Sequence, residues 1–358
     1  MDRSEKKFSC VLVSVLLVFI LAGCNRQSGV GTEPEIRAVW LHTGLFSPAE
    51  SKAASQMDSL FSLYSRVGIN NLFCYNSLPG ENSFQYDYIN MLITEGKRKG
   101  IKIHPIFYPG YTVNIEKELV EHPSWLIRDM EGNPLPHFNL ANPEVRAYWV
   151  ERISEAFKYD IAGIHLDYIR FPTTQVYSYD SLTCETFKEI FSRSPLEVSK
   201  DCGSMIWCEW IKWNSGQVTE LVKGISEAVK NAGKPLVLGA DVFPDIETSN
   251  VLIAQEWGSW AKEGLIDFIC PMLYTNDPEL FRTYIRRAID ASDGNTRVYP
   301  GIGVHTSHND ITKELIVEEV NITREEKTNG MAFFSGYSFN KEMMDTLAVE
   351  AFKGQEGR

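Results

Sequence analysis

Eight short apolar runs alternate with segments of helical periodicity along most of this 358-residue chain, and this alternation restricts the fold more than any other feature. Such alternation is typical of βα units that build a parallel sheet. Eight units are the number that a (β/α)8 TIM barrel requires. A doubly wound sheet is the alternative, but no glycine-rich phosphate-binding loop follows the first run. We therefore predict a barrel whose strands cover residues 36–41, 71–75, 101–107, 162–167, 236–241, 268–274, 297–304 and 330–335.

The segments between the runs carry helix-boundary signals. Asn142 is suited to cap a helix that starts with Pro143, because its side chain can accept a hydrogen bond from the first turn. Gly100 is suited to end an earlier helix, since glycine readily adopts the left-handed conformation. The longest irregular connection, residues 173–203, is predicted to be a loop insertion after strand four that covers the barrel mouth. We expect helices near residues 49–67, 86–99, 143–159 and 205–231.

The N-terminal segment has the features of a bacterial lipoprotein signal. Lys6 and Lys7 precede an apolar run over residues 10–21, and residues 21–24 read Leu-Ala-Gly-Cys, which resembles a lipoprotein cleavage site. The alternative is a transmembrane anchor, but the run is shorter than the roughly 20 apolar residues that cross a bilayer. The expected parts are a signal peptide (1–23), a polar tether that starts at an acylated Cys24 (24–34), and the barrel domain (35–350).

Charge and the residues around the cleavage site indicate location and partners. Asn25 stands where an aspartate would favour inner-membrane retention, and no acidic run follows Cys24. We therefore expect an outer-membrane lipoprotein that faces the periplasm and contacts the membrane through its lipid. The formal net charge is −12 and the sequence contains no basic stripe. Because an acidic surface repels phosphate backbones, we expect no nucleic-acid partner.

The seven cysteines follow no metal-binding pattern. Cys74 and Cys270 lie inside predicted strands and are expected in the core. Cys184, Cys202 and Cys208 fall in the insertion, where an exported protein can form a disulfide, and the sequence does not select the pair.

Aromatic and polar side chains gather where the predicted strands end. In a TIM barrel the active site lies at these carboxyl ends. Flat aromatic faces suit sugar rings, and polar side chains suit sugar hydroxyl groups, although an aromatic residue at a strand end can equally be packing. The expected substrate-binding residues are Trp40, His42, Tyr75, Asn76, Tyr108, His165, Tyr168, Arg170, Tyr274, His305 and Tyr337.

Two aspartates at the ends of neighbouring strands four and five are the expected catalytic pair. Side chains alternate along a strand, so Asp167 points away from the apolar side chains that precede it. Glycoside cleavage needs one carboxyl group as acid and another as nucleophile or base. We expect Asp167 to be the nucleophile or charge stabiliser, supported by Arg170 or His165. Asp241 has apolar neighbours, which raise a carboxyl pKa and suit the acid.

Structural roles are the alternatives for these residues. Asp167 can form an ion pair with Arg170, and Asp241 can cap a helix or order a loop. His165 is expected to fill the barrel layer beneath Asp167 with its ring nitrogens hydrogen-bonded.

Four segments resemble the glycosyl-hydrolase-like family 10 lipoproteins, namely residues 35–41, 138–146, 163–172 and 257–274. The most specific is the strand-four motif Gly-Ile-His-Leu-Asp-Tyr-Ile-Arg-Phe-Pro. The resemblance implies a TIM barrel at the cell envelope that acts on glycans, with members linked to polysaccharide or peptidoglycan glycan strands. Many relatives have two consecutive aspartates in this motif, whereas Tyr168 follows Asp167 here.

We therefore expect a glycoside hydrolase that cleaves O-glycosyl bonds of an oligo- or polysaccharide with Asp167 and Asp241. Two other classes remain open. A glycan-binding barrel without hydrolysis would use the same aromatic residues. A metal-dependent deacetylase or amidohydrolase can share the barrel, but His305 and His308 lie three residues apart without a third ligand. We expect neither a metal ion nor a cofactor.

Overall fold

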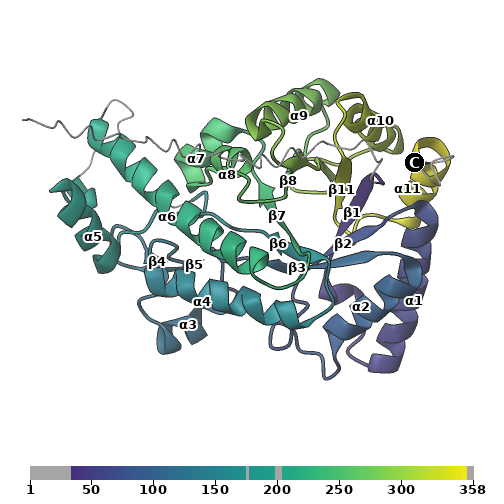
Figure 1. Ribbon diagram of the computed structural model, residues 1–358, viewed down its shortest axis with the longest axis horizontal. Helices are drawn as coiled ribbons and strands as arrows, with labels where there is room; N and C mark the ends of the chain where they lie inside the picture. The colour runs from purple at the N-terminus through teal and green to yellow at the C-terminus, as the bar shows by residue number, and fades with distance from the viewer. Residues whose placement is uncertain (1–33, 175–176, 198–203, 353–358) are drawn as a thin grey trace, which may run out of the picture. The chain divides into compact units, whose positions relative to one another are not determined.

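Nine strands form one parallel sheet in the residues that this computed structural model describes, 34–174, 177–197 and 204–352 (Figure 1). All of them belong to the unit that begins at Glu35. In spatial order they are β10 (Gly301–Gly303), β11 (Gly330–Phe334), β1 (Ile36–Leu41), β2 (Asn71–Cys74), β3 (Lys102–Phe107), β6 (Gly163–Leu166), β7 (Val237–Val242), β8 (Phe268–Pro271) and β9 (Arg297–Val298).

The sheet closes on itself because β9 and β10 are two halves of one strand. β9 pairs with β8, β10 pairs with β11, and only Tyr299 and Pro300 separate the halves. Proline has no N–H group to donate to a neighbouring strand, which accounts for the interruption. A bridge between Met272 and Gly301 also joins the end of β8 to β10. With the halves counted as one strand, eight strands remain, and the predicted TIM barrel is confirmed.

Alternating side chains give the barrel two layers of core. Trp40 of β1 packs inside the barrel with Phe73 and Phe268. Its neighbours Val39 and Leu41 point outward and pack in the larger core that includes the helices. Strands that are buried on both faces read as unbroken apolar runs, which is why the sequence shows them clearly.

Helices cover the outside of the sheet (Figure 1). Asn142 accepts a hydrogen bond from the N–H of Glu144, and Gly100 has a φ of 72° after another helix, so both predicted boundaries are confirmed. The long helices are α1 (Glu50–Val67), α2 (Tyr88–Lys99), α4 (Pro143–Ser154), α6 (Met205–Lys230), α9 (Pro278–Ser292) and α10 (Lys313–Glu325). Shorter helical segments are η1 (Thr43–Leu45), η2 (Glu155–Lys158), η3 (Pro195–Glu197), α7 (Ile246–Ile253), α8 (Trp257–Lys262), α11 (Lys341–Thr346) and η4 (Leu347–Ala351).

The prediction of an irregular insertion after strand four is wrong in part, because residues Ser181–Phe191 form helix α5. The Asp180 side chain caps this helix by accepting a hydrogen bond from the N–H of Thr183 at 3.1 Å. Phe187 packs on Trp210 of α6 with ring centroids 4.7 Å apart, and such tertiary packing supplies most of the stability of a short helix. A second excursion, between β3 and β6, holds α3 (Ile115–Glu121) and the antiparallel strands β4 (Leu126–Arg128) and β5 (Pro134–Phe138).

The cysteines of the insertion are not joined. Cys184 and Cys208 carry free thiols, so no disulfide that includes either of them is formed. Cys202, the third candidate, lies outside the described residues. Cys74 and Cys270 are buried, as predicted.

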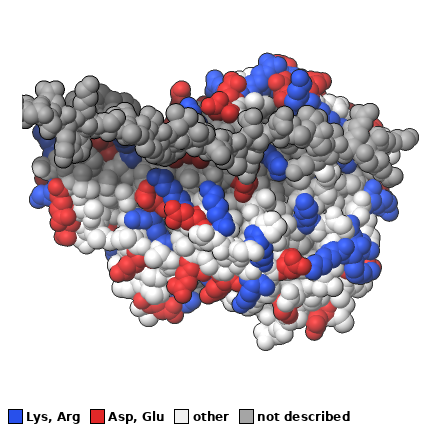
Figure 2. Space-filling model, in the orientation of Figure 1, with Lys and Arg blue, Asp and Glu red and all other residues white. Residues whose placement is uncertain are grey.

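No helix in the described ranges of the chain is long and apolar enough to cross a membrane. The predicted signal peptide, the tether and Cys24 lie outside those ranges. On the face that Figure 2 shows, acidic and basic side chains are interspersed across the described surface.

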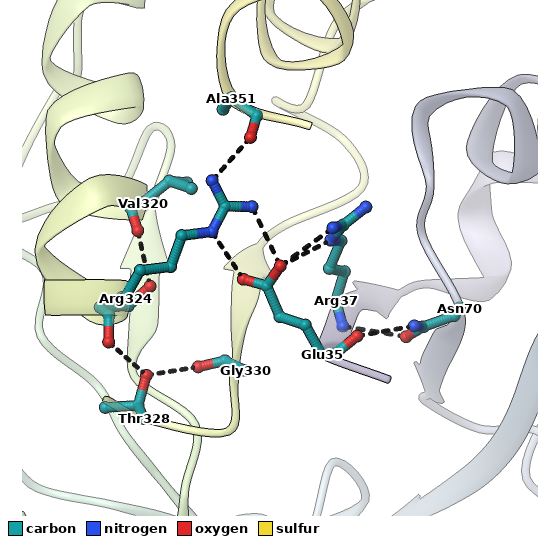
Figure 3. Close-up of polar contacts among 9 residues, drawn as sticks. Glu35, Arg37, Asn70, Val320, Arg324, Thr328, Gly330 and Ala351 are labelled. Atoms are coloured by element: carbon teal, nitrogen blue, oxygen red, sulfur yellow. Dashed lines mark hydrogen bonds and ion pairs between the residues drawn. The ribbon is translucent and has the colours of Figure 1, made fainter. Parts of the chain in front are cut away.

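An ion-pair cluster joins the start of β1 to α10 (Figure 3). The Glu35 carboxylate accepts hydrogen bonds from Arg324 Nε at 3.0 Å and from Arg37 Nη2 at 2.9 Å. Arg324 also donates to the carbonyl of Ala351 at 2.6 Å. Burial alone would raise the pKa of Glu35, but the hydrogen bonds and charges of the two arginines outweigh it and lower that pKa. The cluster therefore ties the first strand to the last helical segments.

Glu319 of α10 is a buried carboxyl group whose oxygens have no hydrogen-bond partner among the described residues. Burial, with a smaller effect of the Glu318 charge, raises the pKa of Glu319 to about 9. The folded protein therefore keeps a proton that the unfolded chain releases above pH 4.5. It follows that stability falls as the pH rises from about 4.5 toward 9.

We expect Glu319→Gln to raise the free energy of unfolding by about 2–4 kcal/mol at pH 8, because the amide never has to ionise. At pH 5 the variant and the wild type should differ little, since Glu319 is then neutral in the folded state. Urea unfolding at the two pH values measures this difference. Glu318→Gln, at the adjacent exposed position, is the matched control; it removes only the smaller charge effect on Glu319 and should raise stability at pH 8 by much less than Glu319→Gln. A Glu319→Gln variant as sensitive to pH as the wild type would contradict the assignment.

Candidate active site

A cavity of about 800 Å³ lies at the carboxyl ends of the barrel strands. This is the end at which TIM barrels hold their active sites. The predicted residues that line it are His42, Tyr75, Asp167, Tyr168, Arg170, Asp241 and Tyr274. The lining also includes Phe243, Tyr284, Thr306, Ser307, His308 and Phe334.

A second cavity, of about 540 Å³, lies at the amino ends of the strands. Its two carboxyl groups have structural roles. Asp160 is 74% exposed and forms an ion pair with Lys97, and Asp267 accepts a hydrogen bond from the N–H of Leu238 at 2.8 Å. Neither carboxyl group is buried in the cavity for acid–base chemistry, so we place the active site at the carboxyl ends.

Asp167 directly follows β6, and two donors fix its carboxylate. Tyr75 Oη donates to Oδ2 at 2.7 Å, and the backbone N–H of Tyr168 donates to Oδ1 at 2.7 Å. Burial and the charge of Asp241 raise the pKa of Asp167, while Arg170 and the two hydrogen bonds oppose this rise. Arg170 does not pair with Asp167; its guanidinium group instead lies over the Tyr168 ring, 4.1 Å from the centroid. The alternative of a structural ion pair is therefore wrong.

Asp241 lies within β7, and its carboxyl group contacts two side chains that lie inside the barrel, beneath the cavity. Trp40 Nε1 donates to Oδ2 at 3.0 Å, and His165 Nε2 lies 2.8 Å from Oδ1. Asp241 is 2% exposed, and burial raises its pKa well above the ordinary value against the opposing effects of Trp40 and the Arg170 charge. Asp241 does not cap a helix, because the side chain of Asp245 caps α7.

His165 supports Asp241 rather than Asp167. Its ring is fully buried inside the barrel and stacks on Phe73, with centroids 4.1 Å apart. Burial lowers the pKa of His165 to about 3, so the ring is neutral at ordinary pH. His165 forms no hydrogen bond with Asp167, because residues two apart on one strand are separated by roughly 6–7 Å. The expectation that both of its ring nitrogens are hydrogen-bonded is wrong in part, since Nδ1 has no partner among the described residues. His165 and Trp40 therefore lie beneath the cavity floor and do not line it.

The two aspartates share one cavity but differ in their surroundings. Tyr75 and a backbone N–H hold Asp167 at the end of its strand, whereas Asp241 lies within its strand between an indole and a neutral imidazole. Burial raises the pKa of Asp241 further than that of Asp167. Surroundings that shift the pKa values of two carboxyl groups by different amounts are typical of an acid–base pair, and here Asp241 is the group whose protonated form is favoured more strongly.

Four other predicted residues lie outside the cavity lining. The Tyr108 hydroxyl group donates a hydrogen bond to the Asn76 side chain. His305 is 68% exposed and contacts an aspartate five residues further along the chain. Tyr337 packs against the ring of His42, with centroids 5.0 Å apart, and is 57% exposed. The structure therefore places Tyr337 at the outer edge of the site and does not bring the others into it.

Four further lining residues were not predicted from the sequence, namely Tyr284, Thr306, Ser307 and Phe334. Thr306 and Ser307 follow β10 and Phe334 ends β11, so the strand-end rule applies to all three. Tyr284 lies on α9, and no local signal shows which face of that helix reaches the cavity.

In the described residues, one group of side chains has the donor types of a metal site. His165, Asp241 and Cys270 place their ligand atoms within 4.8 Å of one another, and all three are buried. His165 and Asp241 already share a hydrogen bond, and burial raises the pKa of the Cys270 thiol, whereas a metal requires the thiolate. The group is therefore better described as part of the buried layer beneath the cavity floor, with Asp241 alone reaching the lining.

Residues 75–307 match the sequence model of the family described as Glycosyl hydrolase-like 10. The match covers well over half of the chain and includes both aspartates. The chain belongs to this family. The resemblance predicted from the sequence is thereby confirmed, and Glycosyl hydrolase-like 10 membership indicates a relationship to glycosidases. No curated protein sequence matches the chain.

Solved structures show the same fold. The PgaB (BpsB) glycoside hydrolase domain from Bordetella bronchiseptica has a TM-score of 0.71 at 11% identity, over 88% of this chain and 98% of that one. The β-galactosidase from the psychrophilic Marinomonas ef1 has a TM-score of 0.61 at 14% identity, over 84% and 54%. The β-galactosidase from Rahnella sp. R3 has a TM-score of 0.64 at 12% identity, over 85% and 51%. The chain spans about half the length of these two galactosidases, and the likeness is one of fold.

Proposed function

We propose that this Glycosyl hydrolase-like 10 protein is a glycoside hydrolase that cleaves a polysaccharide or a peptidoglycan glycan strand with Asp167 and Asp241. The observation that carries the proposal is the pair of buried carboxyl groups that line one cavity from neighbouring strands and have different partners. Glycoside cleavage uses such a pair. The rings of Tyr75, Tyr168 and Tyr274 in the same lining offer flat faces to a sugar.

Asp241 is the proposed acid. Burial raises the pKa of its carboxyl group and favours the protonated form, which gives its proton to the glycosidic oxygen as the bond breaks. Asp167 is the proposed nucleophile or charge stabiliser. The donors Tyr75 and the N–H of Tyr168 hold its carboxylate in place, and its negative charge meets the positive charge that develops at the anomeric carbon.

The test of hydrolysis is a panel of purified polysaccharides that includes peptide-free peptidoglycan strands, incubated with the wild type and with Asp167→Asn. New reducing ends that appear with the wild type alone support the proposal. Binding without cleavage of any glycan would favour the alternative of a glycan-binding barrel. Loss of activity in chelator, with metal in the purified protein, would instead favour a metal-dependent deacetylase or amidohydrolase that uses the group around His165 and Cys270.

We also propose that the protein is a lipoprotein of the bacterial envelope, anchored at Cys24 to the outer membrane and facing the periplasm. The Leu-Ala-Gly-Cys sequence at residues 21–24 supports this location. We expect cells grown with a palmitate analogue to label the wild type and not Cys24→Ser, because the thiol is the acylated group. Cys208→Ser, at an exposed free thiol, is the matched control and should label normally. Equal labelling of Cys24→Ser would contradict the anchor.

A further inference from the structure

Arg170 is the only lysine or arginine among the described residues that line the carboxyl-end cavity. Its guanidinium group lies 4.1 Å from the centroid of the Tyr168 ring and 5.1 Å from that of Phe243. Two aromatic faces therefore hold the cation by cation–π contacts. Its Nε atom is buried and has no hydrogen-bond partner, and the side chain forms no ion pair with a described residue.

The backbone on both sides of Arg170 is fixed. The N–H of Gly110 donates to the carbonyl of Tyr168 at 2.9 Å, and the N–H of Phe171 donates to the carbonyl of Ile253 at 2.9 Å. Gly110 packs so closely that a Cβ atom there would lie 2.2 Å from the carbonyl oxygen of Arg170. A side chain on such a fixed backbone loses little freedom when it binds a ligand, which increases affinity.

The position of Arg170 does not fit a role limited to neutralising the aspartates. Asp167 and Asp241 line the same cavity, and an arginine placed for neutralisation would form an ion pair with one of them. Both carboxyl groups instead have other partners. Asp167 accepts hydrogen bonds from Tyr75 and a backbone N–H, whereas Asp241 accepts one from Trp40 and shares another with His165. The guanidinium donors are therefore left for a ligand.

We propose that Arg170 binds a carboxylate group of the glycan, so that the substrate is an acidic polysaccharide. The planar guanidinium group matches a carboxylate through two parallel N–H···O bonds. This inference rests on the proposed function and assigns the substrate class. The aspartates do not prevent it, because burial raises the pKa of Asp241 and so disfavours its negative charge, while the positive charge of Arg170 offsets that of Asp167.

A matched pair of ligands tests the inference. Each carboxylated glycan, including uronate polysaccharides and peptide-free peptidoglycan strands, is compared with the same polymer after reduction of its carboxyl groups to primary alcohols. Binding is measured by calorimetry in the Asp167→Asn background, so that cleavage is not required. We expect the carboxylated form of the best ligand to bind about 10- to 100-fold more tightly than the reduced form.

Substitutions of Arg170 should separate recognition from a general electrostatic effect. Arg170→Gln should remove the difference in affinity between the carboxylated and the reduced glycan and leave the affinity for the reduced form unchanged. Arg170→Lys should keep part of this difference in affinity. Arg66→Gln, at an exposed position outside the lining, is the control and should keep all of it. If Arg170→Gln lowers the affinity for the carboxylated and the reduced glycan equally, the inference is overturned.

The remaining outcomes distinguish this inference from the proposed function. Equal binding of both forms by the protein with Arg170 intact, or no binding of any carboxylated glycan, would overturn the carboxylate site. Tighter binding of a sulfated polymer that has no carboxylate would overturn the choice of carboxylate. If the wild type cleaves carboxylated and reduced forms at equal rates, the hydrolase stands and the Arg170 site fails. If the preference depends on Arg170 but nothing is cleaved, the site stands and the hydrolase fails.

Discussion

Asp167→Asn is expected to lower kcat/KM for the glycan by at least about 1,000-fold while leaving glycan affinity within about threefold. Asparagine has the shape of aspartate and can still accept the N–H of Tyr168, and its amide nitrogen can donate to Tyr75 Oη. It has no negative charge, so it can neither attack the anomeric carbon nor stabilise the charge that develops there. Reducing-end release and calorimetry measure the two quantities.

The control for this substitution is Asp160→Asn. Asp160 lies shortly before β6, at the amino end of the barrel, and is exposed in an ion pair with Lys97, so activity should not change. Hydrolysis by Asp167→Asn at the rate of the wild type would show that Asp167 is not the nucleophile or stabiliser. A parallel loss of binding would show that it holds the substrate instead.

The strands of the barrel could be predicted because each is buried on both faces and reads as an apolar run. The first predicted strand, 36–41, coincides with β1, and the last differs from β11 by one residue. The seventh predicted strand, 297–304, is divided into β9 and β10 around Pro300. The continuous run of apolar residues gives no indication of this division. Helix α5 could not be predicted from its own sequence, because Phe187 becomes part of a core only when Trp210 of another helix lies opposite.

The catalytic candidates could be placed by topology, but their partners could not. A carboxyl group at the end of a buried strand identifies Asp167 and Asp241 as residues of one cavity. Strand spacing does not show that His165 would reach across to β7. It also does not show that Trp40, expected to bind substrate, would donate to Asp241. These contacts depend on side-chain rotamers inside the closed barrel, and no local pattern in the sequence encodes them.

These contacts are nevertheless what separates the roles of the two aspartates. Asp167 has a phenol hydroxyl group and a backbone N–H as donors, and both favour its ionised form. Asp241 faces His165, whose pKa of about 3 makes the ring neutral, so His165 cannot hold Asp241 ionised by its charge. The surroundings therefore favour the protonated form of Asp241 more than that of Asp167, and substitution of Asp241 tests the role of this proton.

Asp241→Asn is expected to lower kcat/KM for the natural glycan by about 100- to 10,000-fold, the contribution of a general acid. It should spare glycosides whose leaving group needs no proton, such as fluoride or dinitrophenolate, because Asp167 remains intact. The spared activity also shows that the variant folds.

In the wild type, activity on the glycan should fall as the pH rises through the raised pKa of Asp241. This fall of activity at alkaline pH should be absent with the activated glycosides, because their leaving groups need no proton. Asp241→Asn could instead lower the activity on the natural glycan and on the activated glycosides equally, while the fall of activity at alkaline pH persists with both. In that case Asp241 orders the site through Trp40 and His165, and another group supplies the proton.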